Sequence, residues 1–260
     1  MRKLCIGTLA AILAGTCCVA GASARMAEPF FDKPVKVVHV PLPPDKDNPQ
    51  AKPEVRCTYY PDFAVKEIDL GEEGDFQLSI LRGKDSACRK ENSANEKIVS
   101  PDDWTGYFDG VFRNYIFFSA EDGWNGGLGF AVFTPDAKKL FDDVAKKWEM
   151  VATTGLPPPA GIAGNGLALR YVRVYGAKCS LAGASGEACW AKIERDTGLQ
   201  APAPDCEDLY AREQKRTPKV AREILDDPTA IEYDVATTLA MNGVHMSVLP
   251  GPAPVCRPED

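Results

Sequence analysis

Six cysteines constrain the fold of this chain more than any other feature of its sequence. Of the nine cysteines, Cys5, Cys17 and Cys18 lie in an N-terminal segment that we expect to be removed. An even number of remaining cysteines in an exported chain predicts three disulfides and no free thiol. The six that remain are Cys57, Cys88, Cys179, Cys189, Cys206 and Cys256.

Sequence alone leaves the connectivity of six cysteines open. We prefer the local pairs Cys57 with Cys88 and Cys189 with Cys206, which leaves Cys179 with Cys256. The shortest gap, from Cys179 to Cys189, is too long for the C-x-x-C spacing of a zinc or thiol-redox site. We therefore predict structural disulfides and no metal.

The first 24 residues have the pattern of a cleavable signal peptide. Arg2 and Lys3 precede an uncharged, mostly apolar stretch at 4–19, and Ala22-Ser23-Ala24 fits the small-x-small cleavage site. The apolar stretch is shorter than the roughly 18 to 20 residues that span a bilayer. Acylation at Cys17 or Cys18 is the alternative. We expect cleavage after Ala24 and a periplasmic or secreted bacterial protein.

The charge of the mature chain argues against two classes of partner. Loss of Arg2 and Lys3 from the 30 basic residues leaves 28 against 37 acidic residues, a net charge of −9. Nucleic acids and anionic membranes both require clustered Lys and Arg, and no such cluster is visible in the sequence. No apolar run after the signal peptide is long enough to cross a membrane. We expect no nucleic acid partner and no transmembrane anchor.

The order of predicted elements favours an α+β fold that is rich in antiparallel strands. A proline-rich segment at 25–53 contains one edge strand at 35–40, and a single domain follows at 54–260, with a candidate lobe boundary near 155–165. Strands come first, then helices, then strands again, which is the order of α+β rather than α/β proteins. Further strands are predicted at 55–70 with an interruption at Pro61, and at 76–80, 167–175, 231–239 and 244–249.

The strongest local signal is a hairpin. Two aromatic and β-branched runs, 115–118 and 128–133, flank a segment that contains Asn125-Gly126. Both residues of an Asn-Gly pair accept positive φ, as a tight hairpin turn requires. We expect a long hairpin whose tip, at 122–127, is polar and exposed.

Helix signals concentrate in the C-terminal half. Ser185 and Gly198 bound a helix at 186–197, Asp205 can cap a second, and Thr217-Pro218 can begin a third. Thr134-Pro135 precedes apolar residues at helical spacing, which predicts another helix at 137–145. The alternative is a turn followed by a strand, because 141–150 could also be extended.

The common catalytic signatures are absent from the sequence. It has no Gly-x-Ser-x-Gly, no HExxH, no P-loop and no GxGxxG, and its only histidines, His39 and His245, lie in strand-like apolar surroundings. Acidic and aromatic residues around the hairpin remain as candidates, because carboxylates beside aromatic rings suit a glycan-binding cleft or a glycosidase. The candidate binding residues are Trp104, Asp109, Glu121, Asp122, Trp124 and Asn125. The plainer interpretation is a solvated turn with two tryptophans at the core edge.

Three segments carry a resemblance. The first is 122–130, which begins with Asp122-Gly123-Trp124-Asn125. The other two are Cys57-Thr58-Tyr59-Tyr60-Pro61-Asp62 and Cys189-Trp190-Ala191-Lys192-Ile193. In them the chain resembles a group of uncharacterised exported bacterial proteins. The resemblance implies export but no activity, ligand or catalytic residue.

Two hypotheses for function follow from these observations. The first is a non-catalytic binding or envelope-accessory protein without a cofactor, whose partner is an envelope protein or glycan. The second is a hydrolase acting on carbohydrate or cell-wall material through carboxylates, among them Asp102 and Asp103. The fold alone does not choose between them, because function depends on sites.

Overall fold

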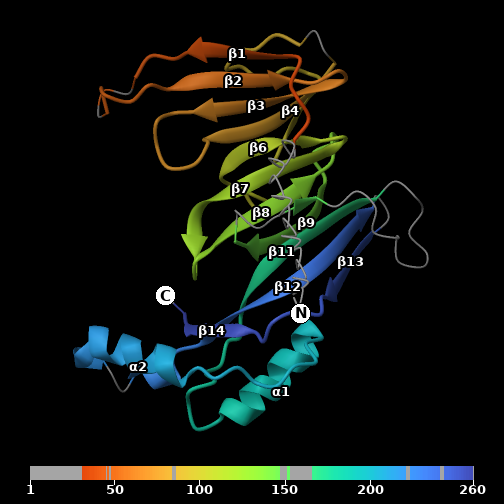
Figure 1. The fold of residues 1–260 in the computed structure, drawn as a ribbon. Coiled ribbons are helices and arrows are strands. Elements are labelled where there is room, and N and C mark those ends of the chain that lie inside the picture. Colours follow the sequence, from red (N-terminus) through yellow and green to blue (C-terminus); the bar gives the residue numbers. More distant parts are fainter. Residues whose placement is uncertain are drawn as a thin grey trace, which may run out of the picture.

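A computed structural model describes residues 31–44, 46, 48–83, 86–146, 151–152, 166–220, 223–240 and 243–259. The predicted signal peptide at 1–24 and the candidate lobe boundary near 155–165 lie outside the described residues. The fold is α+β, as predicted: two antiparallel sheets dominate, and two short α-helices lie in the C-terminal half (Figure 1).

The first sheet is an antiparallel meander of five consecutive strands. Its edge strand lies within the proline-rich N-terminal segment, and Pro61 lies in the tight turn that reverses the chain between the second and third strands. The predicted interruption at Pro61 is therefore a complete hairpin turn. The strands are β1 (Lys36–Pro41), β2 (Glu54–Tyr59), β3 (Phe63–Asp69), β4 (Gln77–Arg82) and β5 (Glu96–Ile98).

The second sheet has the order β13-β12-β11-β9-β8-β7-β6, with two short strands added at its sides. β10 (Val151–Ala152) pairs with β11, and β14 (Val255–Pro258) pairs with β12. The other strands are β6 (Tyr107–Phe112), β7 (Tyr115–Trp124), β8 (Gly127–Phe133), β9 (Lys139–Ala145), β11 (Leu167–Gly176), β12 (Thr229–Ala240) and β13 (Gly243–Val248). The predicted strands at 167–175, 231–239 and 244–249 are confirmed.

The two sheets share one apolar core. Val65 and Ile80 of the first sheet pack against Ile116 and Phe118 of the second, all with no exposed surface. A second core lies on the opposite face of the larger sheet, where Tyr171, Ile231 and their neighbours meet the helices. The alternation of strand residues explains this arrangement, because successive side chains of β7 enter different cores.

The predicted caps are correct for the first α-helix, but the N-cap of the second is Cys206 and not the predicted Asp205. The first, α1 (Gly186–Thr197), is the predicted helix, and it ends at Gly198 in the left-handed conformation, φ 76°. Ser185 occupies the N-cap without making a side-chain capping bond. The second, α2 (Glu207–Arg216), has its first N–H bonded by the Asp205 carboxylate at 3.0 Å. The third helix, predicted to begin at Thr217-Pro218, is wrong: the described residues there form two short 3-10 turns, Pro218–Val220 and Glu223–Asp226.

The helix predicted at 137–145 is also wrong. The alternative of a turn followed by a strand is correct in kind, but the strand is Lys139–Ala145, and the end of the predicted range 141–150 lies outside the described residues. The Thr134 N–H donates to the Lys138 carbonyl at 3.0 Å, and this closes a turn before β9. β9 then pairs with β8 along most of its length. Helical spacing of apolar residues was overridden because the sheet supplies backbone partners and buries the same side chains.

The three disulfides join Cys57 to Cys88, Cys179 to Cys189 and Cys206 to Cys256. The first pair confirms the prediction, and the other two pairings were predicted wrongly. Cys189 lies in the first turns of α1, and the chain folds back from β11 to bring it 5.7 Å, Cα to Cα, from Cys179. Cys206 instead faces β14, because Cys256 pairs with Ile231 in the sheet beneath α2.

Candidate functional site

The hairpin of β7 and β8 closes with the predicted Asn125-Gly126 turn. Both residues have positive φ, 50° and 73°, and Trp124 lies opposite Gly127. Most of the tip is exposed, as predicted: Asp122, Gly123, Trp124 and Gly126 are exposed. Asn125 is buried, and a Cβ on Gly126 would come within 2.6 Å of a guanidinium nitrogen of Arg257. The tip therefore packs onto the β14 side of the larger sheet.

The six predicted binding residues lie in different surroundings. Trp124 packs against Gly176, next to the docked tip, while Trp104 joins the core between the sheets. Asp109 accepts a hydrogen bond from the Ser119 hydroxyl at 3.0 Å. Neither the hollow nor the groove described below is lined by any of the six.

Glu121 and Asp122 lie against the turn between β3 and β4. A Cβ on Gly74 would lie 2.3 Å from the Glu121 carboxyl group, so the absence of a side chain allows this close approach. Gly74 also has a left-handed φ of 77°. A hydrogen bond from Glu73 to Asp122, together with the charges of Asp122 and Glu121, raises the pKa of the exposed Glu73. The three carboxyl groups lie close together on the surface, and the charges of Glu121 and Asp122 act on Glu73.

A carboxyl pair lies beneath that turn, where the two sheets meet: Glu67 is buried and Asp75 is half-buried. Arg56 donates two hydrogen bonds to the Glu67 carboxylate, at 2.7 and 2.5 Å, and the Phe108 N–H of β6 donates a third at 3.3 Å. Asp75 hydrogen-bonds Glu67 from the other side. Burial first, and then the charge and hydrogen bond of Glu67, raise the pKa of Asp75 to about 8. Asp75 is therefore protonated at neutral pH.

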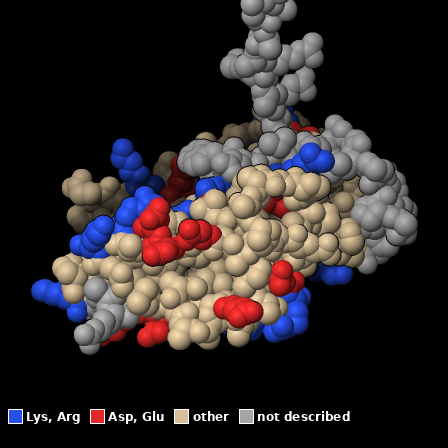
Figure 2. All heavy atoms as spheres, turned by 60° about the horizontal axis from the view of Figure 1, so that its bottom comes forward, with Lys and Arg blue, Asp and Glu red and all other residues tan. Residues whose placement is uncertain are grey.

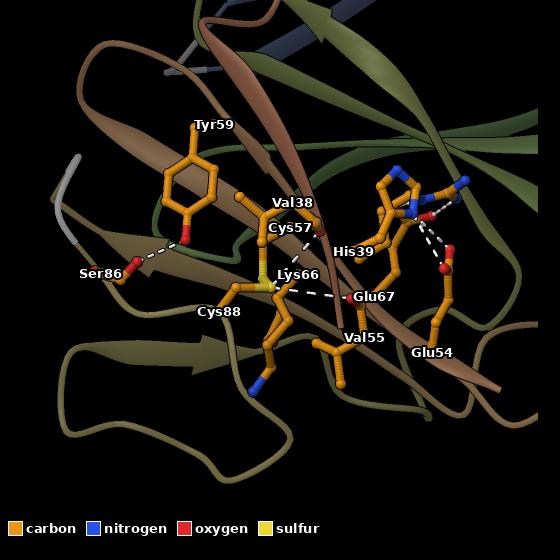
Figure 3. The surroundings of a disulfide bond; sticks show 12 residues. Val38, His39, Glu54, Val55, Cys57, Tyr59, Lys66, Glu67, Ser86 and Cys88 are labelled. Carbon is orange, nitrogen blue, oxygen red and sulfur yellow. Dashed lines mark hydrogen bonds and ion pairs between the residues drawn. A yellow bond between two sulfur atoms is a disulfide. The ribbon is translucent and has the colours of Figure 1, made fainter. Parts of the chain in front are cut away.

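The opposite face of the smaller sheet carries a second buried ion pair, beside the Cys57–Cys88 disulfide. Lys66 lies within 2.6 Å of the Glu96 carboxylate, and both side chains are 1% exposed. Burial acts to raise the pKa of Glu96, but hydrogen bonds from Lys66, Ser79 and the Ser93 N–H together lower it. Figure 3 shows Lys66 below the disulfide, with the Tyr59 hydroxyl bonded to the Ser86 carbonyl nearby.

These carboxyl groups do not have the spacing of a glycosidase. The two acids of such an enzyme stand about 5 Å or more apart so that the glycosidic bond fits between them. Asp75 contacts Glu67 directly, and Glu73 contacts Asp122 directly. Within the described parts of the chain, no group of three or more His, Cys, Asp or Glu side chains could hold a metal ion. The two pairs therefore tie segments together without enclosing a substrate.

A hollow of about 530 Å³ lies between the end of α1 and the connection from β13 to β14. Its lining is uncharged except for Asp234, and Tyr233 of β12 forms part of it. The lining residues are Gly198, Leu199, Gln200, Ala201, Tyr233, Asp234, Val248, Leu249, Pro250, Gly251, Pro252 and Pro254.

A polar network behind this hollow fixes Tyr233. Its hydroxyl accepts a hydrogen bond from Arg173 at 3.0 Å, and Arg173 is paired with the Asp143 carboxylate at 3.0 Å. The Tyr171 hydroxyl donates to the same carboxylate at 2.6 Å. Burial raises the pKa of Tyr171 and of Tyr233, so both phenols stay neutral. These hydrogen bonds satisfy the charges of Arg173 and Asp143 and hold the ring of Tyr233 in place beside the hollow.

Sequence reasoning missed both the carboxyl pair and the hollow. A sequence signal for buried charges was present, because Lys66 and Glu67 are charged residues inside a largely apolar strand. Glu67 belongs to the carboxyl pair, and Lys66 belongs to the ion pair with Glu96. Such residues are costly to bury without partners. The hollow had no comparable signal, because its walls come from distant segments of the chain.

Comparisons with known proteins give no relative. No family model matches the chain, and no curated protein and no solved structure is similar to it. The resemblance to exported bacterial proteins therefore stays a prediction. None of the described helices is long and apolar enough to cross a membrane.

Proposed function

We propose that this chain is an exported, non-catalytic binding protein of the bacterial periplasm or exterior, and that the hollow beside Tyr233 holds an uncharged small molecule with both polar and apolar groups. The hollow itself carries the proposal: its volume of about 530 Å³ falls within the range of small-molecule sites, roughly 300 to 1,000 Å³. Three disulfides fit an oxidising compartment outside the cytoplasm.

The walls of the hollow are held in place before any ligand arrives. Cys179–Cys189 fixes the start of α1, and Cys206–Cys256 fixes the chain just after Pro254. Proline residues restrict the backbone of the wall between β13 and β14. A preformed site loses little conformational entropy on binding, which favours affinity for a small ligand.

The neutral fluorescent probe N-phenyl-1-naphthylamine tests this proposal. We expect saturable binding to the mature protein and at least tenfold weaker binding to the Leu249→Trp variant, because the larger ring fills the hollow. Val244→Trp is the matched control, since Val244 is 41% exposed in β13 and does not line the hollow. Equal probe affinity in both variants, with circular dichroism unchanged, would show that the hollow is not the site.

One observation favours the alternative hydrolase, namely that Asp75 is protonated at neutral pH as a general acid must be. The direct contact with Glu67 argues against it. Screening against glycan and peptidoglycan substrates separates the two functions. Turnover that is lost in Asp75→Asn would overturn the non-catalytic proposal.

A further inference from the structure

A groove between α2 and β14 is lined by arginine side chains. Leu209, Arg212, Glu213 and Arg216 share one helix face, because they recur at spacings of three and four residues. Arg257 and its neighbours in β14 form the opposite wall, and the groove has a volume of about 510 Å³. Figure 1 shows α2 lying beside β14.

The groove is positively charged in a negatively charged protein. It is lined by three arginines and one acid, Glu213, whereas the whole chain has a net charge of −7. Figure 2 shows several Lys and Arg side chains at the end of this face where α2 lies, with Asp and Glu side chains beside them. The groove therefore differs in charge from both the rest of the protein and the hollow beside Tyr233.

Two of the arginines are oriented by interactions within the protein. Arg216 is paired with Glu213 at 3.0 Å, and Arg257 is paired with Glu232. Glu232 is buried and is also bound by Lys146 at 2.5 Å, so its charge is shared between two cations. Arg212 is exposed and donates from Nε to the Asp208 carbonyl at 3.2 Å.

The two walls are covalently joined. Cys206 immediately precedes α2, Cys256 lies in β14 and lines the groove, and the disulfide between them fixes the separation of helix and strand. Arg212 and Arg216 lie one helical turn apart, about 6 Å along the axis. Guanidinium groups bind phosphate and carboxylate oxygens in a bidentate manner, which makes a rigid pair of them selective for multivalent oxyanions.

We propose that this groove binds a phosphorylated ligand through Arg212, Arg216 and Arg257. The apolar side chains of Leu209 and Val255 lie in the same lining and contact the part of the ligand that carries the phosphate. The site is separate from the hollow, so either proposal can fail without the other.

Isothermal titration calorimetry of the mature, oxidised protein with inorganic pyrophosphate tests the groove. We expect binding that weakens with added salt and becomes roughly tenfold weaker in the double variant Arg212→Gln/Arg216→Gln. Lys192→Gln/Arg195→Gln on α1 removes the same charge outside the groove and is the matched control. Both pairs are on helix surfaces, and circular dichroism checks that the variants are folded.

Co-sedimentation with vesicles that contain phosphatidylglycerol identifies the source of the phosphate. Vesicle binding that is lost only in the groove variant would assign the site to a lipid headgroup. Pyrophosphate binding without vesicle binding would assign it to a soluble phosphorylated molecule. If neither probe binds, or if both double variants weaken binding equally, the groove is not a phosphate site.

Discussion

The carboxyl pair between the sheets makes the stability of this protein fall as the pH rises from about 4 to 8. Asp75 is protonated in the folded protein at neutral pH, because its pKa is raised to about 8, and it shares a hydrogen bond with Glu67. In the unfolded chain Asp75 has the ordinary value near 3.8 and is ionised. Asp75 therefore takes up a proton when the chain folds. As the pH rises from 3.8 to about 8, its contribution lowers the free energy of unfolding increasingly.

The size of the effect follows from the shift. One pKa unit corresponds to about 1.4 kcal/mol, so the full shift from 3.8 to about 8 sets an upper limit of about 6 kcal/mol. Asp75 is only half-buried, and the nearby Arg56 offsets part of the cost. Solvent screening of such a group reduces the contribution to about 1–3 kcal/mol.

The Asp75→Asn variant tests this reasoning. An amide has the shape of the protonated acid, and its NH₂ group can donate to Glu67 as the acid does. We expect the variant to equal the native protein in stability near pH 4 and to exceed it by about 1–3 kcal/mol at pH 8.

Urea unfolding with the disulfides intact, at pH 4, 6 and 8, measures the difference between variant and native protein. Asp102→Asn, at an exposed position, is the control and should show no such trend. A loss of stability in Asp75→Asn that is the same at every pH would refute the protonated state of Asp75.

Three further predictions concern the covalent frame and the buried charges. A peptide map without reduction should recover the pairs Cys57–Cys88, Cys179–Cys189 and Cys206–Cys256, and a Cys189–Cys206 peptide would contradict the fold. Lys66→Met should lower the free energy of unfolding by about 3–5 kcal/mol, measured with urea, because it leaves the Glu96 carboxylate buried without its cation. The double variant Lys66→Met/Glu96→Gln should recover stability. An unchanged stability of the single variant would contradict the ion pair. Replacing both Cys206 and Cys256 with Ser should cost about 4 kcal/mol, since their separation of 50 residues is the largest of the three, and a cost below that of the Cys179–Cys189 pair would contradict the loop-closure argument.

Much of the fold is predictable from local sequence, because local rules determine many of its elements. The Asn125-Gly126 hairpin and the helix that ends at Gly198 both depend on backbone conformations that few residues accept. The strand at 139–145 is different. Its apolar residues fit a helix as well as a strand, and only pairing with β8 decides between them. β14 was missed for a similar reason, since its four residues, two of them Arg257 and Pro258, have no strand pattern of their own.

The candidate sites are less predictable than the elements. The hairpin tip is exposed at most of its residues, as its polar sequence predicts, but the burial of Asn125 and the contact of Gly126 with Arg257, from the far end of the chain, could not be predicted. The hollow and the groove depend on contacts between α1, α2, β12 and the segment 249–258. Disulfide connectivity determines several of these contacts, and two of the three pairs could not be chosen from spacing.

The segment 249–258 connects the two proposed sites. Its first part, to Pro254, forms a wall of the hollow, and its second part, from Val255, forms a wall of the groove. The segment is held by the pairing of β14 with β12 and by the Cys206–Cys256 disulfide, so it cannot adjust to one ligand independently of its sheet partner. Rigid walls reduce the entropy lost on binding but also limit the protein to ligands that fit the existing shape. A protein built this way is suited to selective binding, because ligands that do not match the existing walls of the hollow or of the groove are excluded.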